Sequence, residues 1–263
     1  MTIAEYINEL LSREEYSFSW EELMQNSTRT KYSLTNELSR LVDKAQVINL
    51  RQGFYLIIPP RYSKLKTLPI SLYIDKLFTY LSKDYYVGLY SAAKFHGASH
   101  QQIQKDYVIA SMPSNHNIKK EGIAIDFFNI TNWPKNNIIK KKSDAGYFNV
   151  SSPGLTMVDL VHHHLKIGGL NRMMAIIEEL TEELNIDDIN DLLSWYPYKS
   201  TIQRVGYLLQ HLEIESSLID PFHNYLESKR YFPVLLSPKK DQKAGKVDNI
   251  WKVDVNLELE SDL

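Results

Sequence analysis

The chain has 263 residues, which leaves room for two domains, and its 43% apolar content is ordinary for a soluble globular protein. It has no cysteine, which excludes disulfides, thiolate metal sites and a cysteine nucleophile. The N-terminus enters an amphipathic, glutamate-bearing segment instead of a basic and then apolar leader, and no apolar run is long enough to span a membrane. We therefore expect a cytoplasmic protein.

The first 44 residues predict three helices. Residues 2–11 place apolar side chains on one helical face. A second helix should begin at Ser19, because Ser19-Trp20-Glu21-Glu22 has the form of a capping box, and it should end near residues 26–28, which favour turns. A third helix is predicted from Arg29 to Lys44, with a buried stripe of Leu34, Leu38 and Leu41.

The opposite face of the third helix is polar and basic. Side chains of these types bind phosphates and base edges. The residues on this face are Arg29, Thr30, Lys31, Ser33, Asn36 and Arg40.

Two short strands are predicted next, at residues 47–50 and 54–57, around a loop of Arg51-Gln52-Gly53. The loop tip is basic and polar, so Arg51 and Gln52 complete the candidate DNA-binding set. Together these elements predict a winged helix-turn-helix, in which Asn36, Ser33 and Thr30 face base edges and Arg51 and Arg40 meet phosphates.

Charge is segregated in this region. Residues 24–66 carry eight basic side chains against two acidic ones, a net charge of +6, whereas residues 1–23 carry one arginine against six glutamates. Such a basic patch is typical of a phosphate binder. The alternative is a solvated basic surface on a module that contacts only protein, because winged helices also serve in dimerisation and docking.

Residues 59–66 contain two prolines and several charges and are predicted to be a linker, so we place the domains at 1–66 and 67–263. A helical stripe follows from Ser71, and a further helix is expected to end at Gly97. Residues 107–110 and 123–128 should pair as antiparallel strands. Residues 138–139 and 147–150 should flank a lysine-bearing loop that is either solvated or touches nucleic acid or an acidic partner.

The remainder is predicted to be mostly helical. Ser152-Pro153 supplies a cap residue and a first-turn proline for a helix that ends at Gly168-Gly169. Four more helices are expected over residues 173–184, 188–195, 201–212 and 218–229. Residues 251–259 alternate in polarity and predict a strand that returns to the sheet. The fold class is therefore α+β: a winged helix-turn-helix, then a larger mixed α+β domain with a small antiparallel sheet and a helical C-terminal half.

Signals for catalysis are weak. His162, His163 and His164 are consecutive, so on a helix their imidazoles point about 100° apart and cannot converge on one metal ion. Asp126, Asp144 and Asp159 have no spacing signature of a nuclease or other enzyme. We predict no catalytic, cofactor or metal site, and a protein that is not an enzyme.

Five segments, in this order, resemble the AbiEi-type antitoxins and related bacterial transcriptional regulators of type IV toxin–antitoxin (abortive infection, phage defence) systems. The resemblance covers roughly residues 1–212 and departs from the family pattern at Gly154, where a Glu is expected, and at Ala45, where a Gly is usual. The segments are Leu38-Ser39-Arg40-Leu41-Val42 with Gly53-Phe54-Tyr55, then residues 86–97, residues 125–128, residues 150–160 and residues 203–209.

The resemblance implies a winged domain that binds inverted repeats in the double-stranded DNA of its own promoter. It also implies that the larger domain counters a nucleotidyltransferase-like toxin without forming a stable complex with it, so it gives no toxin-contact residues. Two other hypotheses stay open from the sequence: a stand-alone transcription factor whose C-terminal domain dimerises or senses a ligand, and a nuclease-associated protein.

Overall fold

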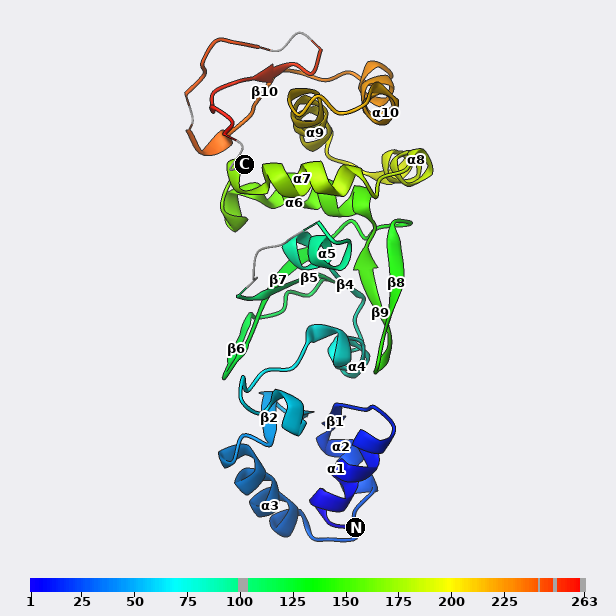
Figure 1. Cartoon of the computed structure of the whole chain (residues 1–263), viewed down its shortest axis with the longest axis vertical. Helices are drawn as coiled ribbons and strands as arrows, with labels where there is room; N and C mark the ends of the chain where they lie inside the picture. The colour runs from blue at the N-terminus through cyan, green and yellow to red at the C-terminus, as the bar shows by residue number, and fades with distance from the viewer. Residues whose placement is uncertain (99–103, 241, 248–249, 261–263) are drawn as a thin grey trace. The chain divides into compact units, whose positions relative to one another are not determined.

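The structure is a computed structural model that describes residues 1–98, 104–240, 242–247 and 250–260 (Figure 1). It is a mixed α+β protein whose chain forms two compact units. The first unit comprises Met1–Tyr86, Gln104–Ile130 and Lys140–Asn149, and the second comprises Val87–Ile103, Thr131–Ile139 and Val150–Leu263. In the described residues, no helix is both long and apolar enough to cross a membrane.

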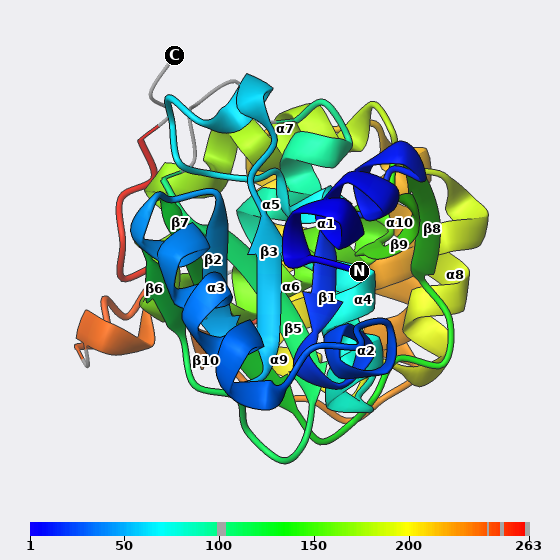
Figure 2. The same ribbon diagram turned by 90° about the horizontal axis from the view of Figure 1, so that it is seen from below.

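The first unit begins with three helices and a three-stranded antiparallel sheet of order β1-β3-β2 (Figure 2). These are α1 (Ile3–Ser12), β1 (Ser17–Ser19), α2 (Trp20–Gln25), α3 (Lys31–Asp43), β2 (Val47–Arg51) and β3 (Phe54–Ile57). We call this part of the chain the N-terminal module. The three predicted helices and the two predicted strands are confirmed, whereas β1 was not expected from the sequence.

The module has a core of its own. Its buried side chains come from all three helices and from the sheet, and none lies beyond Ile57: Ile3, Tyr6, Leu10, Phe18, Leu23, Leu34, Leu38, Val47 and Ile57. The predicted capping box at Ser19 is confirmed. The Glu22 amide donates to the Ser19 hydroxyl over 3.1 Å, and the Glu22 carboxylate accepts from the Ser19 amide over 2.6 Å. The predicted boundary at residue 66 concerns independent folding and stays a prediction.

A larger, mixed sheet follows, with the strand order β6-β7-β5-β4-β9-β8. Its strands are β4 (Tyr85–Val87), β5 (Asp106–Ser111), β6 (Ile118–Lys120), β7 (Ile123–Ile130), β8 (Ile138–Ser143) and β9 (Gly146–Ser151). Before it come two short 3-10 helices, η1 (Pro60–Tyr62) and η2 (Ile70–Leu72), and the helix α4 (Ile74–Leu81). Most residues of this sheet belong to the first unit.

Two predictions about this sheet are wrong. Strands β5 and β7 are parallel, because the segment taken for a polar loop contains β6, which forms the antiparallel hairpin with β7 and leaves β5 the other side of that strand. The lysines expected in a loop, Lys140 to Lys142, lie within β8, and the turn is formed by Asp144-Ala145. Lysines suit this position because β8 is an edge strand, where charge opposes pairing with other chains.

The second unit contains, among its described residues, the α-helices α5 (Leu89–Phe95), α6 (Pro153–Ile167), α7 (Met174–Thr181), α8 (Ile186–Trp195), α9 (Lys199–His211) and α10 (Ser216–Glu227). A 3-10 turn, η3 (Asn171–Met173), precedes α7. The predicted cap of α6 is confirmed, since the Ser152 hydroxyl accepts from the Leu155 amide over 3.2 Å. Its predicted end is also confirmed, because Gly168 has the left-handed φ of 115° that closes a helix.

The predicted C-terminal strand over residues 251–259 is wrong in length and in partner. Only β11 (Val253–Asp254) forms, and it pairs in parallel with β10 (Val234–Leu235) in a separate two-stranded sheet. The cause is Trp251, which is 1% exposed and packs on Gly206 of α9 so closely that a Cβ there would lie 2.0 Å from the indole. The start of the tail is therefore held by α9 and by β10.

Candidate nucleic-acid interface

Helix α3 separates a buried face from a solvated one. Leu34 and Leu38 are buried in the core of the module. Lys31, Asn36 and Arg40 are exposed, as the sequence predicted. The exposed face thus has donors and acceptors that can reach phosphates and base edges, and it lies on a helix whose position the apolar face fixes.

Tyr32 also lies on this face, and the prediction from sequence missed it. Its side chain is 79% exposed, the largest value among the exposed large apolar side chains of the described residues. On a helix it shares one face with Asn36 and Ser39, which follow at i+4 and i+7. That spacing could have identified Tyr32, but a search by polar residue type excludes an aromatic side chain.

The N-terminus of α3 differs in charge from those of the other helices in the module. Glu5 lies in the first turn of α1, and Glu21 and Glu22 lie in the first turn of α2. Helix α3 has no acidic residue in its first turn, only Lys31. No acidic side chain of the first turn therefore neutralises its positive dipole end, which favours an anion such as a phosphate.

Two of the predicted contacts, Thr30 and Ser33, lie together at this end. Thr30 is the N-cap of α3, and its hydroxyl accepts a hydrogen bond from the Ser33 amide over 3.3 Å. Thr30 is exposed and Ser33 is half-buried. The Thr30 hydroxyl therefore caps the start of α3, and its proton remains available to an acceptor outside the chain.

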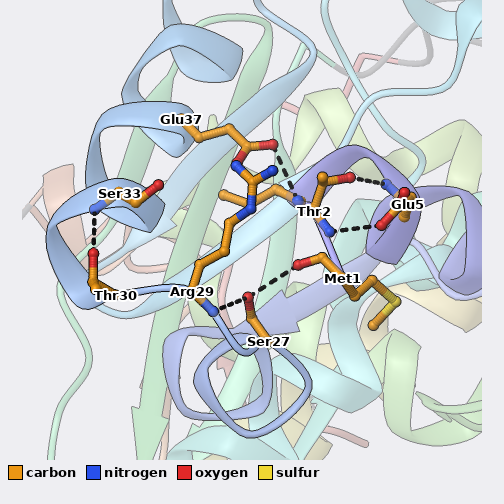
Figure 3. A network of polar contacts seen from close by, with 9 residues as sticks. Met1, Thr2, Glu5, Ser27, Arg29, Thr30, Ser33 and Glu37 are labelled. Carbon is orange, nitrogen blue, oxygen red and sulfur yellow. Dashed lines mark hydrogen bonds and ion pairs between the residues drawn. The ribbon is translucent and has the colours of Figure 1, made fainter.

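Arg29 belongs to a network that joins α3 to the start of the chain (Figure 3). Its guanidinium lies 3.1 Å from the Glu37 carboxylate, whose other oxygen accepts from the Ile3 amide over 3.1 Å. The Arg29 amide donates to the Ser27 hydroxyl, which donates to the Met1 carbonyl. Arg29 is thus partly neutralised by Glu37, which leaves Lys31 and Arg40 as the freer positive charges of this face.

The turn between β2 and β3 is in contact with other parts of the first unit. Arg51 is half-buried: its Nη2 donates to the His116 carbonyl over 2.7 Å, and its guanidinium lies 5.4 Å from the centre of the Phe127 ring. Burial lowers the pKa of Arg51. The side chain of Gln52 is exposed, while its carbonyl accepts from the Tyr80 hydroxyl over 3.1 Å. The structure therefore places Arg51 against β7 and the segment before β6, and leaves Gln52 accessible.

The histidines and aspartates considered for catalysis have separate environments. His162 Nδ1 lies 3.1 Å from the Thr201 hydroxyl, and His164 Nδ1 lies 2.7 Å from the Val161 carbonyl. Asp126 pairs with Lys105, and Asp144 lies 3.4 Å from Arg61. Among the described residues, no group of three or more His, Cys, Asp or Glu side chains could hold a metal ion.

Comparison with protein families identifies the segment that begins at β4 and runs through α9. Residues 86–211 match the AbiEi antitoxin C-terminal domain. The resemblance seen in the sequence is confirmed for this segment, which is similar to the C-terminal domain of AbiEi antitoxins. The match does not extend to the N-terminal module.

Comparison with solved structures agrees on the fold. The chain is similar to the crystal structure of the RV2827C protein from Mycobacterium tuberculosis, with a TM-score of 0.65 and 15% identity, over 95% of this chain and 89% of that one. A weaker likeness, with a TM-score of 0.35 and 10% identity over 56% of this chain and 89% of the other, is to an antigenic nucleotidyltransferase-like protein from Paracoccidioides brasiliensis. No curated protein matches.

Within the matched segment, Gly154 stands where the resemblance predicted a Glu, and the structure gives a reason. The Gly154 amide, in the first turn of α6, donates to the Asp188 carboxylate of α8 over 2.7 Å. A Cβ at Gly154 would lie 2.7 Å from the same carboxylate oxygen. Asp188 is itself held by the Asn137 side chain, which accepts from the indole of Trp195. Glycine thus makes room for a carboxylate supplied by another helix.

The second departure, Ala45, follows α3. Its φ of 53° is left-handed, the conformation in which glycine is preferred. The backbone here adopts the turn that the family pattern implies, although alanine is strained in it.

Proposed function

We propose that this protein is a DNA-binding antitoxin that represses its own promoter and counters a nucleotidyltransferase-like toxin encoded beside it. The N-terminal module would be a winged helix-turn-helix, with α3 as the reading helix and β2–β3 as the wing. The antitoxin-like domain would comprise residues 67–263. It would act in the cytoplasm and without a stable complex with the toxin.

One observation carries the DNA-binding part of the proposal: α3 presents Lys31, Tyr32, Asn36 and Arg40 to solvent from a helix anchored by buried leucines. Two others support it. The element order and the antiparallel β1-β3-β2 sheet suit a winged helix, and the first turn of α3 lacks the acidic residues of α1 and α2. The antitoxin part rests on the family match over residues 86–211.

The experiment measures binding of the full chain to a duplex containing its own promoter, with random duplex as the competitor. The wild-type protein should bind the promoter more tightly than the competitor, and affinity should fall as salt rises. An Asn36→Ala and Arg40→Ala double variant should lose this preference. Arg13→Ala is the control, because Arg13 is an exposed arginine at the C-cap of α1 in the same module, paired with Glu9 and Glu15.

If the wild-type chain binds neither duplex, or if the Arg13 variant loses as much as the α3 variant, α3 is not a reading helix. A promoter reporter in cells that carry the adjacent toxin gene tests autoregulation. Survival of the same cells tests toxin neutralisation.

A further inference from the structure

A groove runs through the N-terminal module between helix α3 and the strands β2 and β3. Helix α3 packs beside β2, as Figure 2 shows. The groove, which we call the α3 groove, has a volume of about 380 Å³, and its lining includes Trp20 at the start of α2, Leu38 and Val42 of α3, and the cross-strand pair Asn49 and Tyr55. Small-molecule sites in proteins measure about 300 to 1,000 Å³, so the groove has room for a small ligand.

The apolar lining is held in place by the core of the module. Leu38 belongs to that core. Trp20, Val42 and Tyr55 pack against it. The Tyr55 ring also stacks on the buried ring of Phe18, with centroids 5.4 Å apart and an angle of 20° between the planes. Aromatic side chains in fixed positions favour a planar aromatic ligand, because contact between rings is worth more than the area that it buries.

The polar groups of the groove include donors that the protein itself leaves unused. In the described part of the chain, the indole N–H of Trp20, the hydroxyl of Tyr55 and the side-chain amide of Asn49 make no hydrogen bond. Their spare donors are available to a ligand that carries hydrogen-bond acceptors. A mostly apolar hollow with a few donors is the usual composition of a small-molecule site.

The charge of the groove favours an anion. Lys31 is the charged residue among those that line it in the described structure, and it is exposed at the first position of α3. Within residues 1–98, 104–240, 242–247 and 250–260, no carboxylate lies within ion-pair distance of Lys31. The dipole of α3 adds positive potential at the same end of the helix. A carboxylate would receive charge-assisted hydrogen bonds there.

We propose that the α3 groove binds a planar aromatic anion, with its rings against Trp20 and Tyr55 and its carboxylate at Lys31. Lys31 also belongs to the exposed face of α3 that carries the proposed function. The bound anion therefore competes with a DNA phosphate for one ammonium group and relieves repression. Ligand binding is independent of the proposed function, whereas the competition rests on it.

The groove also has a purely structural explanation, in which a helix and a sheet diverge and leave a hollow that no ligand uses. Such a hollow takes up small aromatic molecules by apolar contact alone, or takes up none. Discrimination between a charged and a neutral ligand of the same shape, lost when Lys31 is replaced, distinguishes a built site from a hollow.

The test is isothermal titration calorimetry of the full chain, without DNA, against naphthoate and its neutral counterpart naphthamide. The wild-type chain should bind naphthamide about five-fold more weakly than naphthoate, the difference expected of one exposed charge pair. Lys31→Met should bind both compounds with similar, lower affinity. Lys44→Met is the matched control, because Lys44 is an exposed lysine at the C-cap of α3 outside the groove, and it should bind as the wild type does.

A second variant fills the groove. Ser39 is exposed on α3 and lines the groove, so Ser39→Trp should abolish binding of both compounds while circular dichroism shows an intact fold. The inference is wrong if the wild-type chain binds neither compound or binds both equally well. It is also wrong if Lys31→Met and Lys44→Met lose equal amounts.

Competition with DNA is measured by fluorescence anisotropy of a labelled promoter duplex. Saturating naphthoate should weaken DNA binding by the wild-type chain by about the factor that Lys31→Met itself produces, with an equal concentration of sodium chloride as the control for ionic strength. If the chain binds naphthoate but no duplex, the ligand site stands and the proposed function fails. If it binds both and neither affects the other, the site stands and the competition is wrong.

Discussion

The carboxylate of Asp188 in α8 accepts a hydrogen bond from the amide of Gly154 in the first turn of α6, over 2.7 Å. The first amides of a helix have no partner within the helix, and the helix dipole favours a negative charge beside them. The Ser152 hydroxyl satisfies the Leu155 amide and Asp188 satisfies that of Gly154, so two elements share this task. A carboxylate side chain at position 154 itself is therefore not needed.

Replacing Gly154 with glutamate, the residue expected from the resemblance, should destabilise this protein. The new Cβ would lie 2.7 Å from the Asp188 carboxylate, and two carboxylates would compete for one helix end. We expect the free energy of unfolding to fall by about 2 to 3 kcal/mol, measured by urea denaturation. Asp188→Asn keeps the shape and one acceptor, and should cost about 1 kcal/mol. Equal stability of Gly154→Glu and wild type would contradict this account.

The exposed face of α3 predicts different consequences for its polar and its charged residue. Asn36→Ala should cost about 1 to 3 kcal/mol on the promoter site and little on random duplex, because an amide side chain reads base edges. Arg40→Ala should weaken binding to both and lower the salt slope by about one, because a phosphate contact is independent of sequence. Competition titrations at two salt concentrations distinguish these patterns. Identical losses from both changes on both duplexes would refute the division of roles.

Variants of Arg51 test whether this side chain contributes a positive charge to DNA binding or anchors the β2–β3 turn to the rest of the first unit. Its bond to His116 and its packing on Phe127 predict that Arg51→Ala lowers the free energy of unfolding by about 1 to 2 kcal/mol. If anchoring is its role, the salt slope for DNA should change by less than one. The Arg51→Lys variant keeps the positive charge but loses the planar guanidinium group, so this variant should be destabilised as well. A full unit of lost slope with unchanged stability would instead support the direct phosphate contact predicted from sequence.

Features that depend on neighbouring residues could be predicted from the sequence, whereas features that depend on distant residues could not. The starts of α2 and α6 could be predicted from the sequence, because each is set within four residues of chain, by Ser19 with Glu22 and by Ser152 with Pro153. The orientation of β7 relative to β5 depends on pairings between residues 19 positions apart. The partner of Arg51 and the placement of Trp251 depend on residues 65 and 45 positions away. A period-two pattern such as that at residues 251–259 marks a half-buried segment, but it does not say which surface buries it.

The same distinction between local and long-range determinants applies to the candidate DNA-binding residues. The exposed face of α3 follows from helical spacing, so Lys31, Asn36 and Arg40 could be predicted, and Tyr32 could have been. The environment of Arg51 could not, because its carbonyl partner is 65 residues further along the chain.

The histidines of α6 predict a dependence of stability on pH. Burial lowers the pKa of all three, and that of His163 to about 3. In the unfolded chain His163 should titrate near its usual value of about 6.5, so the unfolded state gains protons first as pH falls. The stabilising contribution is fully present above pH 6.5 and is lost as the pH falls toward 3.

For His163 alone, allowing for its partial exposure, the loss should reach about 1 to 2 kcal/mol by pH 5. Urea denaturation at pH 7.5 and pH 5 measures it. His163→Gln removes the titrating group and should flatten this part of the profile. A profile identical to that of the wild type would show that His163 is protonated as easily in the folded state as in the unfolded one.

Repression and toxin neutralisation should separate genetically, because the reading face and the matched antitoxin domain lie in different stretches of chain. Asn36→Ala with Arg40→Ala changes only exposed side chains of α3, outside the core of the module and outside residues 86–211. Cells that carry the adjacent toxin should therefore survive when the full-length double variant is supplied from an unrelated promoter, while a reporter of the native promoter stays unrepressed. The design needs protein levels measured by immunoblot, since a loss of abundance would mimic a loss of function. If the variant is as abundant as the wild type but loses both repression and protection from the toxin, the prediction is wrong. Neutralisation would then depend on DNA binding by the same protein.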